Sequence, residues 1–245
     1  MITHDEYRHD VDIDEYGGRS PGPAALSPGP LIPVFGDSFA FGLGVRDAET
    51  FVSVIDARIS ARLINVGMPG SSLPHELDSL DALDGALDAP PACVFVVFLG
   101  NDLEDIEVAA RRSGSGDHVE HCARDFSRVV ERLVATAARL TFIPVVILIP
   151  DRCQVNTTLR ADKARLYGYE FSTLDPDRPT RLVIDVLAAK GVTVVDASPC
   201  LAGDGPYYYV GDNHLTASGH RRVADRIGPR LAEVLDPRRP VRHTP

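Results

Sequence analysis

Three residues of this chain have the types and the spacing of a serine nucleophile and its proton acceptor. Ser38 lies in a Gly-Asp-Ser-Phe segment directly after a short apolar run. A serine at a strand-to-helix turn is exposed at the edge of a sheet, where amides at the start of the helix can stabilise an anion. Much further along the chain, a single residue separates Asp212 from His214. If this segment is extended, the carboxylate can reach Nδ1 of His214 and hold Nε2 toward a serine.

Two further segments carry donors that could stabilise an oxyanion. Asn65–Gly70 follows the second apolar run, and its glycines let backbone amides approach a ligand closely. The third run leads into Gly100-Asn101-Asp102, where the Asn101 side chain can donate a hydrogen bond to a developing negative charge. Each motif by itself also matches ordinary turn or helix-capping chemistry. Because all of them follow predicted strands, we expect them to meet at one edge of a sheet, which favours a catalytic site.

The elements that position these motifs alternate along the chain. Short runs rich in Val, Ile and Phe do not alternate with polar residues, which is typical of strands buried on both faces. Amphipathic stretches with helical spacing lie between and after them. The predicted strands are Leu31–Phe35, Leu63–Val66, Cys93–Leu99, Phe142–Ile149 and Val192–Val195, and the predicted helices include Glu49–Ala61, Ala123–Leu140, Thr180–Ala189 and Ala217–Val234.

This alternation predicts an α/β fold with one doubly wound, flavodoxin-like sheet. We expect five parallel strands in the order 2-1-3-4-5, with helices on both faces in three αβα layers. Residues 31–236 would form this domain. Residues 1–30, which hold two Pro-Gly-Pro runs, would form a poorly ordered peripheral arm, and residues 237–245 a C-terminal tail.

Composition excludes several classes of protein. A chain of 245 residues with 44% hydrophobic and 24% charged residues can bury a core. The net charge of −10 argues against a general nucleic-acid binder. The apolar runs are too short to span a bilayer, no secretory signal is visible, and the four cysteines show no CxxC pair. These features predict a cytoplasmic protein with free thiols, and they leave its oligomeric state open.

The four motifs together resemble the signature blocks of the SGNH (GDSL) hydrolase family. The resemblance covers roughly residues 31–235. The segments Phe35–Gly42, Ile149–Val155 and Asp175–Pro179 also resemble a bacterial branch often associated with the modification of glycans. The resemblance implies a serine-dependent hydrolase that acts on a small acyl ester, such as an acetyl ester, of a small molecule or glycan, and it implies no metal or organic cofactor.

The same resemblance implies a role for each motif residue. Ser38 would be the nucleophile, His214 the base and Asp212 the acid that orients it. The oxyanion hole would consist of the Ser38 and Gly70 amides and the Asn101 side chain. Two departures stand out. The usual family spacing places the acid three residues before the histidine, where this chain has Gly211, and the usual Gly-x-Asn-Asp block is shortened because Gly100 directly precedes Asn101.

Two other functions use the same residues or the same fold. An O-acyltransferase would pass the acyl group to a sugar or another hydroxyl, and the sequence does not separate it from an esterase. A non-catalytic ligand-binding module is disfavoured because serine, glycine, asparagine and histidine are all retained.

Two segments outside the motifs also carry functional side-chain types. Asp117–Cys122 is rich in metal-ligand types, but Asp117 and Glu120 match a capping box, so we do not predict a zinc site. Tyr207–Tyr209 either line an acyl or sugar pocket or pack within their loop.

Overall fold

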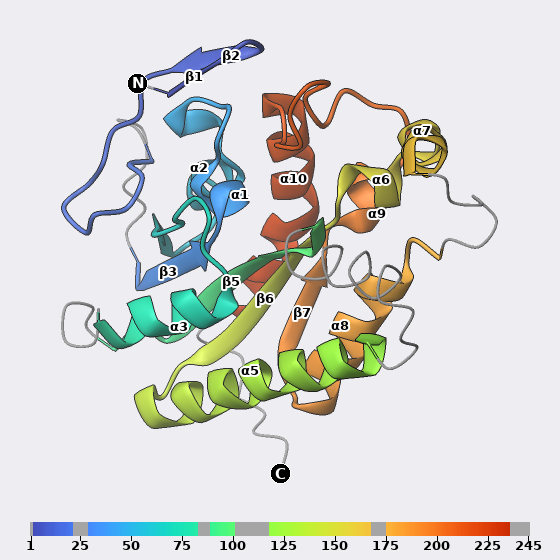
Figure 1. Cartoon of the computed structure of the whole chain (residues 1–245). Coiled ribbons are helices and arrows are strands. Elements are labelled where there is room, and N and C mark those ends of the chain that lie inside the picture. The colour runs from blue at the N-terminus through green and yellow to red at the C-terminus, as the bar shows by residue number, and fades with distance from the viewer. Residues whose placement is uncertain (1, 22–28, 83–88, 101–117, 168–174, 236–245) are drawn as a thin grey trace.

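The computed structural model describes residues 2–21, 29–82, 89–100, 118–167 and 175–235. Its centre is a five-stranded parallel sheet in the order β4-β3-β5-β6-β7, which is the predicted order 2-1-3-4-5 of these strands (Figure 1). The strands are β3 (Leu31–Gly36), β4 (Arg62–Asn65), β5 (Ala92–Phe98), β6 (Ile143–Ile149) and β7 (Thr193–Asp196). Each boundary lies within one residue of the range predicted from the apolar runs.

Helices cover both faces of the sheet, so the predicted three-layer α/β fold is confirmed (Figure 1). The longer helices are α2 (Phe51–Asp56), α3 (Leu73–Ala82), α5 (His118–Leu140), α7 (Thr157–Tyr167), α8 (Arg178–Ala189) and α10 (Ala217–Val234). The shorter ones are α1 (Ser38–Phe41), α6 (Arg152–Val155), α9 (Ser198–Leu201) and the 3-10 helix Asp47–Glu49. Among the described residues, no helix is long and apolar enough to cross a membrane.

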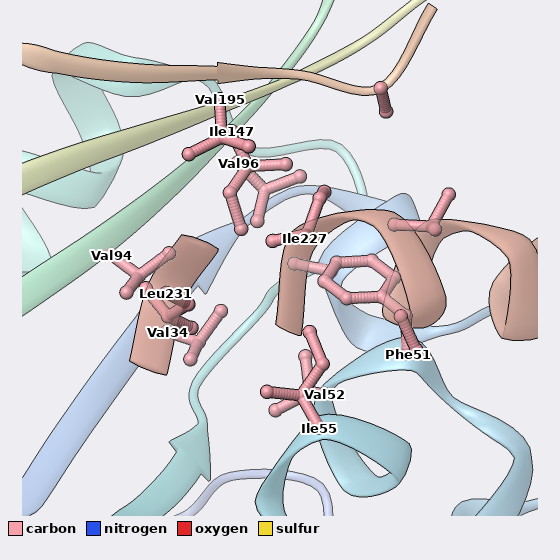
Figure 2. Close-up of a cluster of buried hydrophobic side chains, with 14 of the residues drawn as sticks. Val34, Phe51, Val52, Ile55, Val94, Val96, Ile147, Val195, Ile227 and Leu231 are labelled. Carbon is pink, nitrogen blue, oxygen red and sulfur yellow. The ribbon is translucent and has the colours of Figure 1, made fainter. Parts of the chain in front are cut away.

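Strand β5 shows why an uninterrupted apolar run forms a central strand. Its side chains alternate between the two faces, and every residue of the strand is buried. Val94, Val96 and Phe98 pack with α2 and α10. Figure 2 shows Val94 and Val96 in this cluster. Cys93, Phe95 and Val97 pack with α3, α5 and α8 on the other face. Both faces therefore need apolar residues.

The first long helix is shorter than predicted. The spacing predicts a helix over 49–61, whereas α2 spans Phe51–Asp56. The Thr50 hydroxyl caps its start by accepting from the Ser53 amide at 3.0 Å. At its end the Asp56 carboxylate accepts from the Leu63 amide at 2.6 Å, which ties the helix end to β4. These side-chain bonds set both boundaries.

The N-terminal segment differs from the peripheral, poorly ordered arm predicted for residues 1–30. Strands β1 (Ile2–His4) and β2 (Tyr7–His9) form a separate antiparallel hairpin. Tyr7 is 8% and Arg19 only 1% exposed. Arg19 forms an ion pair with Asp47 at 2.7 Å, and its backbone amide donates to the Asn65 carbonyl. The expectation is therefore corrected for residues 2–21, because their side chains find partners on the domain.

Candidate active site

Ser38 is the first residue of α1 and lies just beyond the carboxyl end of β3. The Asp37 side chain caps the helix by accepting from the Phe39 amide at 2.8 Å. Gly36 makes the tight approach to the helix possible. A Cβ at this position would lie 2.5 Å from the Cβ of Ala40 and 2.8 Å from that of Val96. The turn therefore presents the serine at the sheet edge predicted from the sequence.

Ser38, His214 and Asp212 form one hydrogen-bonded series. The Ser38 Oγ lies 2.7 Å from His214 Nε2, and His214 Nδ1 lies 2.6 Å from Asp212 Oδ1. The His214 and Asp212 side chains are 18% and 14% exposed. The structure thus brings together three side chains from segments 174 residues apart in sequence, at distances suited to proton transfer.

The local backbone pairs Asp212 with His214 in a different way from the one predicted. Residues 210–214 bend and do not form an extended strand. Asp212 Oδ1 also accepts from the backbone amide of His214 at 3.2 Å, which makes an Asx turn. The pairing of carboxylate and imidazole is therefore held by this turn, in place of the same-face geometry of an extended segment.

Asp212 is ionised in this arrangement. Burial raises its pKa, but the hydrogen bond from Tyr7 and the proximity of His214 outweigh it, so that the pKa lies below its usual value. The Tyr7 hydroxyl donates to Asp212 Oδ2 at 2.6 Å, leaving Oδ1 for His214. Nothing in the sequence around Tyr7 indicated this contact, which joins positions 205 residues apart.

Asn213 points away from His214 toward the end of β6. Its Nδ2 donates to Asp151 Oδ2 at 2.8 Å. Asp151 is 5% exposed, and with Gln154 it forms the capping box of α6. In the sequence, Asp151 stands out only as part of the segment Ile149–Val155. The structure shows that this carboxylate anchors the loop between Asp212 and His214.

Of the predicted oxyanion donors, the structure describes Ser38 and Gly70 but not Asn101. Gly70 follows β4 and has a φ of +81°, with open space where a Cβ would lie. This left-handed conformation favours glycine. Beside it, the Ser71 hydroxyl donates to the Gly36 carbonyl at 2.9 Å and links this turn to the turn before Ser38. Asn101 lies outside the described residues, as does Asp102.

Two of the tyrosines before the Asp-His segment tie their loop to neighbouring segments of the domain. The Tyr208 hydroxyl donates to the Pro150 carbonyl at 2.7 Å, and burial raises the pKa of Tyr208 well above its usual value. The Tyr209 hydroxyl donates to the Gly44 carbonyl at 2.7 Å. Of the two alternatives for these residues, the structure favours loop packing. The side chains of the Asp117–Cys122 segment lie outside the described residues.

The chain belongs to the GDSL-like lipase/acylhydrolase family, whose model matches residues 34–222. This match covers all of the motifs described above. No curated protein sequence matches the chain.

Solved structures with low sequence identity share the fold. One is TesA, with a TM-score of 0.59 and 16% identity over 84% of this chain and 99% of that one. A member of the lipolytic protein G-D-S-L family from Veillonella parvula DSM 2008 gives 0.52 and 18%, over 80% and 95%. A catalytic mutant of Axe2, an acetylxylan esterase from Geobacillus stearothermophilus, gives 0.53 and 13%, over 82% and 94%. At these identities the likeness concerns the fold alone.

Proposed function

We propose that this chain is a serine-dependent ester hydrolase that acts on a small acyl ester through an acyl-enzyme. The observation that carries the proposal is the continuous series of hydrogen bonds from Ser38 Oγ through His214 to Asp212. A serine hydroxyl is a weak nucleophile at neutral pH, and it needs an adjacent base held by a third group. Family membership supports the same reaction class.

In the proposed reaction, His214 Nε2 takes the Ser38 proton while Oγ forms a bond to the ester carbonyl carbon. The Ser38 and Gly70 amides and the Asn101 side chain are proposed to stabilise the resulting oxyanion. His214 then gives its proton to the departing alcohol, and the acyl group remains on Ser38. Water repeats the sequence, with His214 as base, and releases the acid.

A small acyl group is favoured by the packing beside the nucleophile. The rings of Phe39 and Phe98 are stacked with centroids 3.9 Å apart, and both are buried. The Phe39 ring also lies 5.2 Å from the His214 ring. Since these two rings are buried against each other, neither offers an exposed face to an acyl chain. We propose an ester of a small molecule or a glycan as substrate, such as an acetyl ester.

An O-acyltransferase would use the same residues and differ only in the acceptor, with a sugar or other hydroxyl in the place of water. Ester screening tests the hydrolase assignment. Wild-type protein is expected to hydrolyse p-nitrophenyl esters with a preference for acetyl over octanoyl, and Ser38→Ala to retain less than about 1% of the activity. Circular dichroism would check that the variant is folded.

Two results would change this assignment. Turnover by folded Ser38→Ala above a few per cent of the wild-type rate would remove Ser38 as nucleophile. Accumulation of an acylated alcohol, when an acceptor is added, in place of the free acid would assign the chain as an acyltransferase.

A further inference from the structure

The N-terminal hairpin contacts the loop that carries Asp212 and His214, although it belongs to a separate small sheet. Tyr7 on β2 is buried, and its hydroxyl donates to Asp212 Oδ2. Its ring lies 4.9 Å from the ring of Tyr209, in the same loop. The two carboxylate oxygens of Asp212 therefore have different partners, Tyr7 on one side and His214 on the other.

Glu6, in the turn between β1 and β2, holds the backbone of the same loop. Its carboxylate accepts from the amides of Val210 at 3.0 Å and Gly211 at 2.7 Å. A Cβ at Gly211 would lie 3.0 Å from Glu6 Oε2, so the absence of a side chain there leaves room for this contact. Charge-assisted hydrogen bonds of this kind are stronger than those between neutral groups.

We propose that the hairpin is a positioning element of the active site, in which Tyr7 orients the Asp212 carboxylate and Glu6 holds the loop that carries it. This inference rests on the proposed function, because it concerns the acid of the proposed triad. With Oδ2 bound to Tyr7, the carboxylate cannot rotate away from His214 without losing a hydrogen bond. The hairpin would thus hold the imidazole toward Ser38 through Asp212.

The hydrogen bond between Tyr7 and Asp212 changes the pKa of both groups, so its loss can be measured. Burial, followed by the hydrogen bond with Asp212, raises the pKa of Tyr7, so its hydroxyl stays a proton donor at neutral pH. That bond is also one cause of the lowered pKa of Asp212. Removing the hydroxyl takes a hydrogen-bond donor from the Asp212 carboxylate, which raises its pKa and changes the acceptor that His214 Nδ1 faces.

Other charged or titratable groups lie near the hairpin and near the loop that carries Asp212 and His214. They are His4, Glu6 and His9 of the hairpin, Glu49, Asp151, Arg152, Tyr209 and His220.

The test compares Tyr7→Phe with Tyr16→Phe in the full chain. Tyr16 belongs to the same N-terminal segment, but its ring lies beside the Arg62 guanidinium, 5.9 Å from the ring centroid. The readouts are the NMR resonance of the His214 Nδ1 proton, and kcat and KM for p-nitrophenyl acetate. Tyr7→Phe is expected to shift this resonance, because the acceptor of the Nδ1 proton has lost its own donor, and to lower kcat roughly tenfold, with KM unchanged. Tyr16→Phe should change neither.

Two outcomes overturn the role of Tyr7. One is an Nδ1 proton resonance and a kcat that both match the wild type. The other is a lower kcat with an unmoved Nδ1 resonance, which would mean that the loss does not pass through the Asp212–His214 contact. The NMR measurement requires no turnover, so a shifted resonance in a protein that hydrolyses no ester would refute the proposed function and leave the Tyr7 contact supported.

Glu6 is tested by amide exchange. Glu6→Ala is expected to speed hydrogen–deuterium exchange at the Val210 and Gly211 amides at least several-fold, since both lose their acceptor. Unchanged exchange at both amides would remove Glu6 from the proposal.

Discussion

At the scale of single residues, the hydrogen bonds around His214 determine which ring nitrogen carries the proton. Asp212 is ionised because its pKa is lowered despite burial, and a carboxylate can only accept. Nδ1 must therefore be the donor in the 2.6 Å contact with Asp212. The neutral ring then has its lone pair on Nε2, 2.7 Å from Ser38 Oγ, which is the tautomer that a serine base requires.

Replacing Asp212 by asparagine tests this tautomer. The amide keeps the shape of the side chain but can donate toward Nδ1, so the ring is expected to present a protonated Nε2 to Ser38. We expect Asp212→Asn to lower kcat by about 10²–10⁴ with the fold intact. Steady-state kinetics on a p-nitrophenyl ester would measure the loss.

Asn213→Ala is the matched control, since it removes only the bond to Asp151 on the far side of the loop. Its expected cost in kcat is roughly tenfold or less. If Asn213→Ala proved the more damaging of the two, Asp212 would not be the acid of the triad.

At the scale of elements, the features that depend on local sequence pattern, above all the strands, could be predicted from the sequence. The uninterrupted apolar runs predicted every strand of the main sheet, because a strand covered on both faces needs apolar residues throughout. Ser38 and Gly70 were predicted at strand ends, where the structure has them. What depends on long-range contact was missed: Tyr7 and Arg19 have no local signal, because their partners are set by the folded chain.

Arg19 makes the N-terminal segment part of the domain, and its removal tests that conclusion. Its guanidinium pairs with Asp47 and donates to the carbonyls of Phe41, Gly42 and Val45, at the end of α1 and just after it. Because Arg19→Leu leaves these buried acceptors unpaired, we expect it to lower the free energy of unfolding by about 3–5 kcal/mol. Urea unfolding followed by circular dichroism would measure this.

The exposed pair of Arg58 and Asp225 provides the comparison. Arg58→Leu is expected to cost no more than about 1 kcal/mol, because surface ion pairs contribute little. Equal losses for the two variants would show that residues 2–21 contribute no more to stability than a surface pair does.

At the scale of the whole molecule, a buried histidine links folding to pH. His220 of α10 is 1% exposed, and its Nδ1 accepts from the Phe51 amide of α2 at 3.1 Å. Burial, together with the charge of Arg19, lowers the pKa of His220 from 6.5 to about 3. The helices that cover one face of the sheet therefore meet through an imidazole that must stay neutral.

The sign of the effect follows from proton uptake. Between pH 6.5 and about 3 the unfolded chain binds a proton at His220 that the folded chain does not, so acid favours unfolding. This contribution reaches about 1.4 kcal/mol per pH unit. His220→Gln keeps an acceptor for the Phe51 amide, and it is expected to flatten the fall in unfolding free energy below pH 6. A slope identical to that of the wild type would contradict the buried neutral imidazole.

The proposed role of Ser38, a nucleophile activated by His214, is tested by locating a covalent adduct. Folded wild-type protein would be treated with a fluorophosphonate, digested and mapped by mass spectrometry. One phosphonylated residue, Ser38, is expected, with no adduct in Ser38→Ala or His214→Ala under the same conditions. An adduct on another serine such as Ser71, or no adduct in active, folded protein, would contradict it.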